Sequence, residues 1–277
     1  MKLINLLYKY RYGGAEKVAH SYSIICNKLG FQSLILGLKS GSRVSHENDV
    51  HLTKSKLNYF RTVSKAASEG NVFICHCNFA LICLILLKLF KFNFNAKCYY
   101  VQHLEYSPRK RRVIYVLVNL LFDGLIEIKS ESYEEVKYID ENKLVKIHNF
   151  SVAGKSEISK KDKVNLECIK KMQADNTLCL LFVGAVKEGK GIEHLIGIAD
   201  ALKLSLNKFK IIFVGDGEGL FSFKERVKSS GLDGNFIFCG YSSNPELYMH
   251  FSDALLFTSD RSEVTPMVVL EAINSRL

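Results

Sequence analysis

The chain has 277 residues, of which 48% are apolar and 24% charged, a balance that excludes an intrinsically disordered protein and allows two domains of ordinary size. A formal net charge of +10 favours an anionic partner, whether a phosphorylated substrate, an anionic lipid or a nucleic acid. Eight cysteines without a ladder of spaced pairs argue against a disulfide framework and favour free thiols in a reducing cytosol.

The first half of the chain alternates between short apolar runs, rich in β-branched and aromatic residues, and longer segments of helical spacing. Such alternation is typical of a mostly parallel α/β sheet, so residues 1–150 are expected to form one doubly wound, Rossmann-like domain. The apolar stretch 79–90 has about half the length that a membrane-spanning helix needs, so no transmembrane segment is expected. The expected strands span 3–8, 33–38, 72–76, 98–104, 125–128 and 145–150, and two of the helices span 15–29 and 111–122.

A polar, lysine-rich segment, 151–176, follows and is interpreted as a linker. The strand and helix pattern then restarts over 177–277, which predicts a second Rossmann-like domain. Its expected strands span 178–183, 211–215, 236–240 and 254–259, and its expected helices span 192–206, 220–230 and 245–251.

A last helix is expected to begin at Pro266, with Thr265 as its cap. Threonine can accept hydrogen bonds from the free amides of the first turn, and proline has no N–H that would lack a partner there. The helix is apolar nearly all round, which predicts burial between layers. It is expected to run to Leu277 without a C-cap or a following strand, so the second domain is expected to be incomplete.

Two glycine-containing loops are candidate ligand contacts. Gly13 and Gly14 precede the first helix, where a ligand can approach the backbone and the helix amides attract negative charge, although a plain tight turn explains them equally well. The loop 184–191 nearly matches the phosphate loop of nucleotide hydrolases, but Gly191 replaces the hydroxyl residue that would hold magnesium. Lys190 is still expected at the carboxyl edge of a sheet, where doubly wound folds bind ligands; a solvated loop charge is the alternative.

The most specific pattern is a pair of glutamates, Glu263 and Glu271, with seven residues between them. Glu263 lies in the loop ahead of the last expected helix, and Glu271 lies about 9 Å along the helix axis from the cap. One carboxylate is then placed to contact a sugar and the other a ribose, with helix amides between them facing a diphosphate. A buried carboxylate is costly without a hydrogen-bond partner, so Glu271 on an apolar helix favours a ligand site over an exposed surface glutamate.

Taken in order, these motifs resemble those of the retaining glycosyltransferases of family 4, among the glycosyl transferases group 1. The resemblance runs from Leu180 to Glu271, and in the first half it includes Gly13-Gly14-Ala15-Glu16 and His103 at a strand end. It implies a GT-B fold, with two Rossmann-like domains facing a cleft and the second one C-terminally truncated here. The implied activity is transfer of a sugar from a nucleoside diphosphate with retention, without a metal or other cofactor.

The resemblance also implies roles for residues of the second domain. Glu271 would bind the donor ribose, Glu263 would act on the transferred sugar as a catalytic residue, and Lys190 would bind the leaving diphosphate. Val264 and Thr265 would contribute donor-binding amides after Glu263. In the first domain, Gly13 or Gly14 would contact the donor phosphate and sugar, and the catalytic His103 would lie beside the reacting sugar.

One position departs from the family pattern. Ala185 stands where the family usually has an arginine, which leaves Lys190 to neutralise the leaving group unless Lys187 or Arg261 substitutes. Cys75 and Cys77 flank His76, but alternate residues of a strand point to opposite faces, so a metal site is not expected and His76 is left as a residue that could line the cleft.

The implied partners are a nucleotide-sugar donor and a glycan or lipid-linked acceptor of surface polysaccharide biosynthesis, such as an O-antigen, capsule or lipopolysaccharide. The basic run 109–112 precedes an apolar helix and could bring a cytoplasmic enzyme to the anionic inner face of the cell membrane, although a solvated helix start also explains it. An inactive truncated remnant that keeps donor-site residues is the alternative function. Nucleic-acid binding is not expected, because only the net charge supports it.

Overall fold

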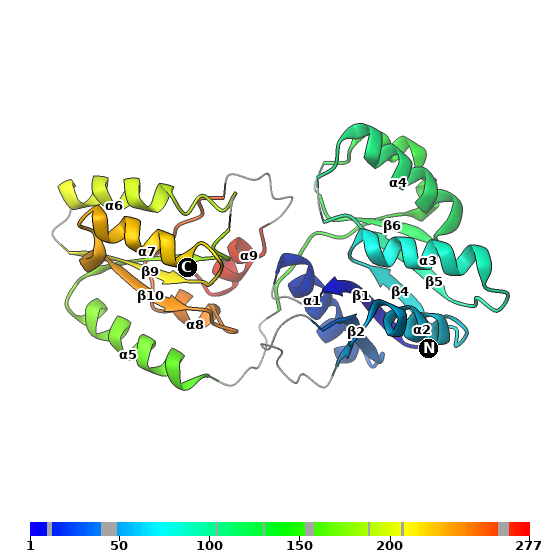
Figure 1. Ribbon diagram of the computed structural model, residues 1–277, viewed down its shortest axis with the longest axis horizontal. Helices are drawn as coiled ribbons and strands as arrows, with labels where there is room; N and C mark the ends of the chain where they lie inside the picture. Colours follow the sequence, from blue (N-terminus) through cyan, green and yellow to red (C-terminus); the bar gives the residue numbers. More distant parts are fainter. Residues whose placement is uncertain are drawn as a thin grey trace. The chain divides into compact units, whose positions relative to one another are not determined.

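The computed structural model describes residues 1–9, 13–39, 49–103, 105–129, 131–152, 158–187, 189–205, 208–259 and 266–277. The chain divides into an N-terminal unit, Met1–Ser151, and a C-terminal unit, Val152–Leu277 (Figure 1). Each unit is built on a parallel sheet, as the sequence predicts.

The N-terminal unit has a seven-stranded sheet in the order β3-β2-β1-β4-β5-β6-β7. Because the winding reverses between β1 and β4, the carboxyl ends of these two strands form the topological switch point, where open α/β sheets bind ligands. The strands are β1 Leu3–Lys9, β2 Ser33–Leu38, β3 Val50–Thr53, β4 Val72–Cys75, β5 Lys97–Val101, β6 Gly124–Glu127 and β7 Leu144–Lys146.

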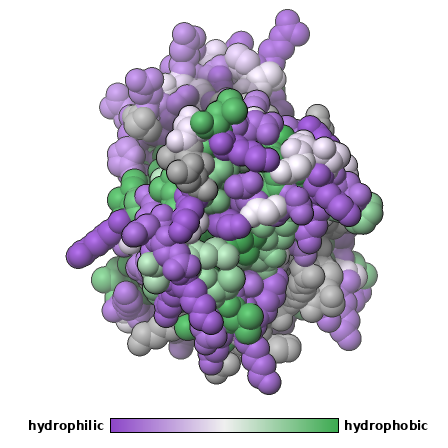
Figure 2. Space-filling view, turned by 90° about the vertical axis from the view of Figure 1, so that its left-hand side faces the viewer, coloured by the Kyte–Doolittle hydropathy of each residue, from purple (hydrophilic) through white to green (hydrophobic). Residues whose placement is uncertain are grey.

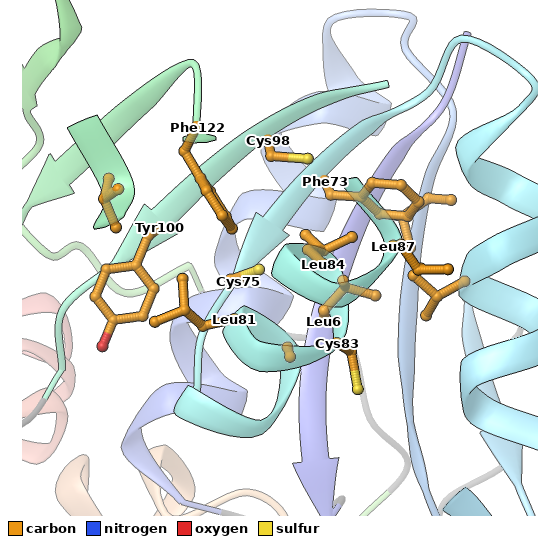
Figure 3. Close-up of a cluster of buried hydrophobic side chains, with 14 of the residues drawn as sticks. Leu6, Phe73, Cys75, Leu81, Cys83, Leu84, Leu87, Cys98, Tyr100 and Phe122 are labelled. Carbon is orange, nitrogen blue, oxygen red and sulfur yellow. The ribbon is translucent and has the colours of Figure 1, made fainter. Parts of the chain in front are cut away.

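Helices cover both faces of this sheet because its residues alternate between two cores. Leu6 and Cys75 belong to the larger core, which contains residues of α2, α3 and α4 (Figure 3). Leu7 and Ile35 pack on the other face with Ala19 of α1. The helices are α1 Gly14–Lys28, α2 Lys56–Ala67, α3 Asn78–Phe90 and α4 Pro108–Leu121, with 3-10 turns η1 Glu134–Tyr138 and η2 Glu141–Lys143.

The C-terminal unit has a four-stranded sheet in the order β10-β9-β8-β11, so its switch point lies between β8 and β11. One face packs against α6 and α7, and the other against α5, α8 and α9. Hydrophilic side chains cover most of the face of this unit seen in Figure 2, with apolar groups between them. The strands are β8 Leu178–Val183, β9 Phe209–Val214, β10 Phe236–Gly240 and β11 Ala254–Leu255; the helices are α5 Lys160–Ala174, α6 His194–Ser205, α7 Leu220–Ser229, α8 Glu246–Met249 and α9 Met267–Asn274, with a 3-10 turn η3 Asp233–Asn235.

Helix α5 occupies most of the segment 151–176, so the interpretation of that segment as a linker is wrong over residues 160–174. Ser159 is the N-cap of the helix, because its Oγ accepts a hydrogen bond from the Asp162 amide at 3.0 Å. The inward face carries Leu166 and Ile169, and lysines occupy much of the rest. This narrow apolar stripe within a basic segment explains why the composition alone resembles a linker.

The end of α9 also differs from the expectation. Pro266 is the N-cap rather than the first helical residue, and the helix ends at Asn274 instead of running to Leu277. Arg276 adopts a left-handed φ of 60°, which lets the Leu277 amide donate to the Ala272 carbonyl at 3.0 Å. These features form a Schellman C-cap, which the sequence conceals because arginine replaces the usual glycine. Within the described ranges, no helix is both long and apolar enough to cross a membrane.

Candidate functional site

The loops after β8 and β9 pack backbone to backbone at the carboxyl edge of the C-terminal sheet. The Val186 amide donates to the Asp216 carbonyl at 3.0 Å, and the Gly184 amide donates to the Val214 carbonyl at 3.1 Å. A Cβ atom at Gly215 would overlap the carbonyl of Gly184. The glycines therefore allow a close approach of the two loops.

Lys190 lies at the switch point between β8 and β11, and the loop after β11 holds its backbone. Thr258 Oγ1 donates to the Lys190 carbonyl at 3.2 Å, and Ser259 Oγ donates to the Gly189 carbonyl at 3.2 Å. The Lys190 side chain is partly buried. The sequence does not predict these two hydrogen bonds, because no local pattern reveals a contact between loops so far apart along the chain.

Gly191 explains why this loop differs from the phosphate loop of nucleotide hydrolases. Its φ is +60°, and a Cβ atom there would overlap the carbonyl of Thr258. A serine or threonine at this position would suffer both backbone strain and a steric overlap. The hydroxyl that would hold magnesium in a phosphate loop therefore does not fit here.

Glu271 lies on α9 and has only 3% of its surface exposed. This burial contradicts the alternative interpretation of a solvated surface glutamate. It also places the carboxylate one helical turn beyond Met267, in the helix that follows the loop after β11. The other expected donor-loop residues, Arg261, Glu263, Val264 and Thr265, lie outside the described residues.

In the N-terminal unit, α1 begins at Gly14, and Gly13 is its N-cap. Gly13 has extended backbone angles and offers no side chain to cap the amides of the first turn. A Cβ atom at Gly13 would come within 2.8 Å of Glu16 Oε2. Neither glycine brings a side chain to the helix N-terminus on the switch-point side of β1, and the Glu16 carboxylate lies close by.

His103, which follows β5, is half-buried and adjoins a row of buried polar side chains under α1. His76 Nδ1 lies 2.8 Å from His103 Nε2, and His76 Nε2 lies 2.9 Å from Asn5 Oδ1. Asn5 and His76 point to the α1 face because they alternate with core residues of the opposite face. Tyr22 of α1 packs against the His76 ring, with 5.8 Å between ring centroids.

Both imidazoles are neutral at pH 7. Burial lowers the pKa of His103 to about 4. Burial also lowers the pKa of His76 well below its ordinary value, and the neighbouring His103 lowers it further. The two rings meet edge to edge through this hydrogen bond, with 5.1 Å between centroids, so a positive charge on either one would be poorly solvated and close to the other.

Gln102 is a further candidate that the sequence did not reveal. It follows β5, has 4% of its surface exposed, and neither polar atom of its amide has a hydrogen-bond partner in the described part of the chain. A buried amide without partners costs free energy, and such groups are uncommon away from functional sites. The polar pair formed with His103 directly after an apolar strand is the local signal that marks it.

The C-terminal part of the chain matches a known family. Residues 167–277 match the family model described as Glycosyl transferases group 1. No curated protein matches the chain.

Solved structures match over nearly the whole chain. Anabaena Alr3699/HepE in complex with UDP-glucose has a TM-score of 0.71 and 20% identity, with 99% of this chain and 78% of that chain covered. A TarM mutant from S. aureus, in complex with fondaparinux, alpha-GlcNAc-glycerol and UDP, has a TM-score of 0.68 and 10% identity over 100% and 84% of the two chains. WaaG, a glycosyltransferase involved in lipopolysaccharide biosynthesis, has a TM-score of 0.66 and 14% identity over 99% and 79%. These likenesses show that the fold is of the GT-B kind.

Proposed function

The Glycosyl transferases group 1 domain and the structural neighbours indicate a glycosyltransferase enzyme, and we propose that it transfers a sugar from a nucleoside diphosphate to a glycan or lipid-linked acceptor with retention. The proposed pathway is surface polysaccharide biosynthesis of the O-antigen or capsule type. The observation that carries this proposal is the position of Lys190 at the switch point, held by Thr258 from the loop that leads toward α9 and the buried Glu271.

In the proposed donor site, Lys190 binds the diphosphate and Glu271 binds the ribose. A carboxylate suits a ribose because its two oxygens can accept hydrogen bonds from two neighbouring hydroxyl groups. The donor loop is completed in this proposal by Glu263, Val264 and Thr265. For these three residues the proposal rests on the family resemblance alone.

The proposed reaction needs no metal, because groups of the chain can meet the charge that develops on the leaving diphosphate. Lys190 supplies a full positive charge, and the first amides of α9 supply partial ones, since Pro266 offers no side-chain cap for them. Ala185, where related enzymes usually carry an arginine, is exposed, and so is Lys187 two residues later. We propose Lys187 as a second cation for the leaving group.

In the N-terminal unit, we assign Gly13, Gly14 and His103 to the transferred sugar and its phosphate. The open amides at the start of α1 can donate hydrogen bonds, and the neutral imidazole of His103 can exchange one with a sugar hydroxyl. Glu16, close to Gly13, disfavours a fully charged phosphate there, so of the two groups we place the sugar, through a hydroxyl, against Gly13.

We also propose that the outer faces of α3 and α4 contact an anionic membrane. The two helices are neighbours, because Tyr106 OH, just before α4, donates to Asn78 Oδ1 of α3 at 3.0 Å, and Lys88 of α3 lies over the Phe122 ring at 5.6 Å (Figure 1). Their outer faces carry large apolar residues at helical spacing, which a water-exposed surface does not favour. These residues are Ile82, Leu86, Leu89 and Phe90 on α3 and Val113, Val116 and Leu120 on α4.

Basic residues at the start of α4 give this surface the charge that an anionic membrane requires. Arg109, Lys110 and Arg112 are exposed, whereas Arg111 turns inward and forms an ion pair with Glu135 at 2.7 Å. A basic cluster beside apolar side chains fits anionic headgroups with their acyl chains, and thus the inner face of the cell membrane.

A donor panel tests the proposed function. The protein is incubated with UDP-, GDP-, ADP- and dTDP-sugars and with candidate acceptors, and nucleoside diphosphate release is measured. We expect release with one donor class, and a product whose anomeric configuration, read by NMR, equals that of the donor. Binding of a nucleoside diphosphate in calorimetry without any release would support a donor-binding chain that has no turnover. Neither binding nor release with any donor would refute the proposal.

A further inference from the structure

A chain of hydrogen bonds runs from the middle of β1 to His103. Asn5 Nδ2 donates to Ser33 Oγ at 3.4 Å, which turns Asn5 Oδ1 toward His76. Asn5 and His76 are both buried. Tyr22 packs against the His76 ring, and His103 meets the edge of that ring through the Nδ1–Nε2 hydrogen bond. The position of the His76 ring is therefore set by one packing contact and two hydrogen bonds.

The donor–acceptor direction of these hydrogen bonds determines which ring nitrogen of each histidine carries the proton. A carbonyl oxygen accepts only, so His76 Nε2 must carry the hydrogen that bonds to Asn5 Oδ1. A neutral imidazole has one N–H, so His76 Nδ1 is an acceptor, and His103 Nε2 must donate to it. His103 Nδ1 is then left with a lone pair.

We infer that Asn5 and His76 are positioning residues that hold His103 as its Nε2–H tautomer, so that His103 Nδ1 accepts a hydrogen bond from a hydroxyl of the transferred sugar. The inference rests on the proposed function for the identity of the ligand, but the tautomer itself follows from the three side chains. Because such a nitrogen accepts and cannot donate, the arrangement selects a hydroxyl at this point of the sugar over a group that only accepts.

Imidazole nitrogen NMR on the protein labelled with nitrogen-15 at histidine reads the tautomers directly, without a ligand or turnover. We expect His76 and His103 in the native protein to be neutral at pH 7, each with its hydrogen on Nε2. His103 with its hydrogen on Nδ1 would overturn the inference. This measurement needs no substitution, so a variant that does not fold cannot leave the question open.

The substitution Asn5→Asp can reverse the donor–acceptor direction of the hydrogen bond between His76 and His103. A carboxylate at this position favours the imidazolium form of His76, whose Nδ1–H then donates to His103 Nε2 and moves the hydrogen of His103 to Nδ1. The matched control is Asn71→Asp, another buried asparagine of this unit, whose Oδ1 accepts the Lys2 amide at 2.8 Å. We expect the control to leave both tautomers unchanged. The same spectra read the protonation of His76: where His76 is the imidazolium, an unchanged His103 tautomer would contradict the inference, and where His76 stays neutral, a His103 hydrogen on Nδ1 would contradict it.

Transfer assays separate this inference from the proposed function. With the tautomer reversed, we expect Asn5→Asp to lower kcat/KM for the donor sugar about ten- to a hundredfold, because a hydrogen bond becomes a mismatch. The affinity for the free nucleoside diphosphate should stay native. If the native protein transfers no sugar, the proposed function fails while the tautomers remain readable. If the tautomer reverses and kcat/KM stays native, the role of His103 Nδ1 is wrong.

Discussion

Thr258 Oγ1 donates to the carbonyl of Lys190 at 3.2 Å and joins the loop after β11 to the loop after β8. This bond connects the two strands on either side of the switch point of the C-terminal sheet. It fixes the backbone from which the Lys190 side chain extends, so the loop that leads to α9 and the loop that carries the cation are positioned together.

The Thr258–Lys190 bond can be removed without a change in side-chain size. We expect Thr258→Val to weaken nucleoside diphosphate binding about fivefold, in line with the loss of about 1 kcal/mol for one hydrogen bond. Calorimetric titration measures this nucleoside diphosphate affinity. Thr62→Val is the control, because Thr62 Oγ1 donates to the Asn58 carbonyl at 2.8 Å in the other unit, and its loss should leave this affinity native. Equal affinities in both variants would speak against the coupling of the two loops.

Gly191→Ala tests the close packing of the same two loops. The added Cβ overlaps the Thr258 carbonyl and meets a left-handed backbone, so we expect a loss of unfolding free energy of at least about 2 kcal/mol, together with loss of nucleotide binding. Gly231→Ala separates the two causes, because Gly231 has a φ of +65° and no atom of the described residues lies within 4 Å of a Cβ built there. In chemical denaturation, the control should lose only about 1 kcal/mol of unfolding free energy. The overlap argument fails if both variants lose the same amount.

Glu271→Gln keeps the size of the buried side chain and removes its charge. We expect nucleoside diphosphate affinity to fall about tenfold, because hydrogen bonds from hydroxyl groups to a charged acceptor are stronger than those to a neutral amide. Glu225→Gln on the exposed side of α7 is the control and should bind as the native protein does. Native affinity in folded Glu271→Gln would remove this residue from the proposed ribose site.

The buried histidines predict how stability depends on pH. Because burial lowers the pKa of His103 to about 4, the unfolded chain binds more protons than the folded one between that value and the ordinary pKa of 6.5. Stability should therefore fall as the pH drops from about 7 to 5, by up to about 1.4 kcal/mol per pH unit for each such histidine. Urea denaturation at several pH values measures the slope, and His103→Gln should flatten it. The same slope in both proteins would contradict the neutral state of His103.

Vesicle sedimentation tests the membrane-contact surface of α3 and α4. Replacing Arg109, Lys110 and Arg112 together by Gln should weaken binding to vesicles rich in anionic lipid about a hundredfold, since each basic residue contributes about 1 kcal/mol. Leu120→Glu should weaken it as well. Leu204→Glu, at a still more exposed leucine of α6, is the control that should bind normally. Binding that persists in the triple variant would rule out this surface.

The strands of the C-terminal sheet show what the sequence could predict. The bounds of β8 and β10 agree with the expectation, because each is an apolar run closed by a glycine or a polar loop. The strand β3 and the helix α2 were not predicted. β3 has four residues, and α2 buries only Tyr59, Val63 and Ala67 among polar neighbours, so neither gives a strong periodic signal.

The site was predicted in part, for a reason that lies in the topology. Lys190 and Glu271 stand out because a charge beside glycines or on an apolar helix is unusual locally. The partners that position the site are distant along the chain: Asn5 and His76 are 71 residues apart, and Thr258 and Lys190 are 68 apart. Strand order brings them together, and no local pattern encodes it.

The most direct test of the proposed enzyme compares nucleoside diphosphate release by the native protein and by Lys190→Ala, with the nucleotide-sugar that the native protein binds most tightly. We predict steady release by the native protein and a rate lower by about a hundredfold or more in the folded variant, because the leaving diphosphate loses its nearest cation. Equal rates in the two proteins, or no release by the native protein from any donor, would contradict the proposal.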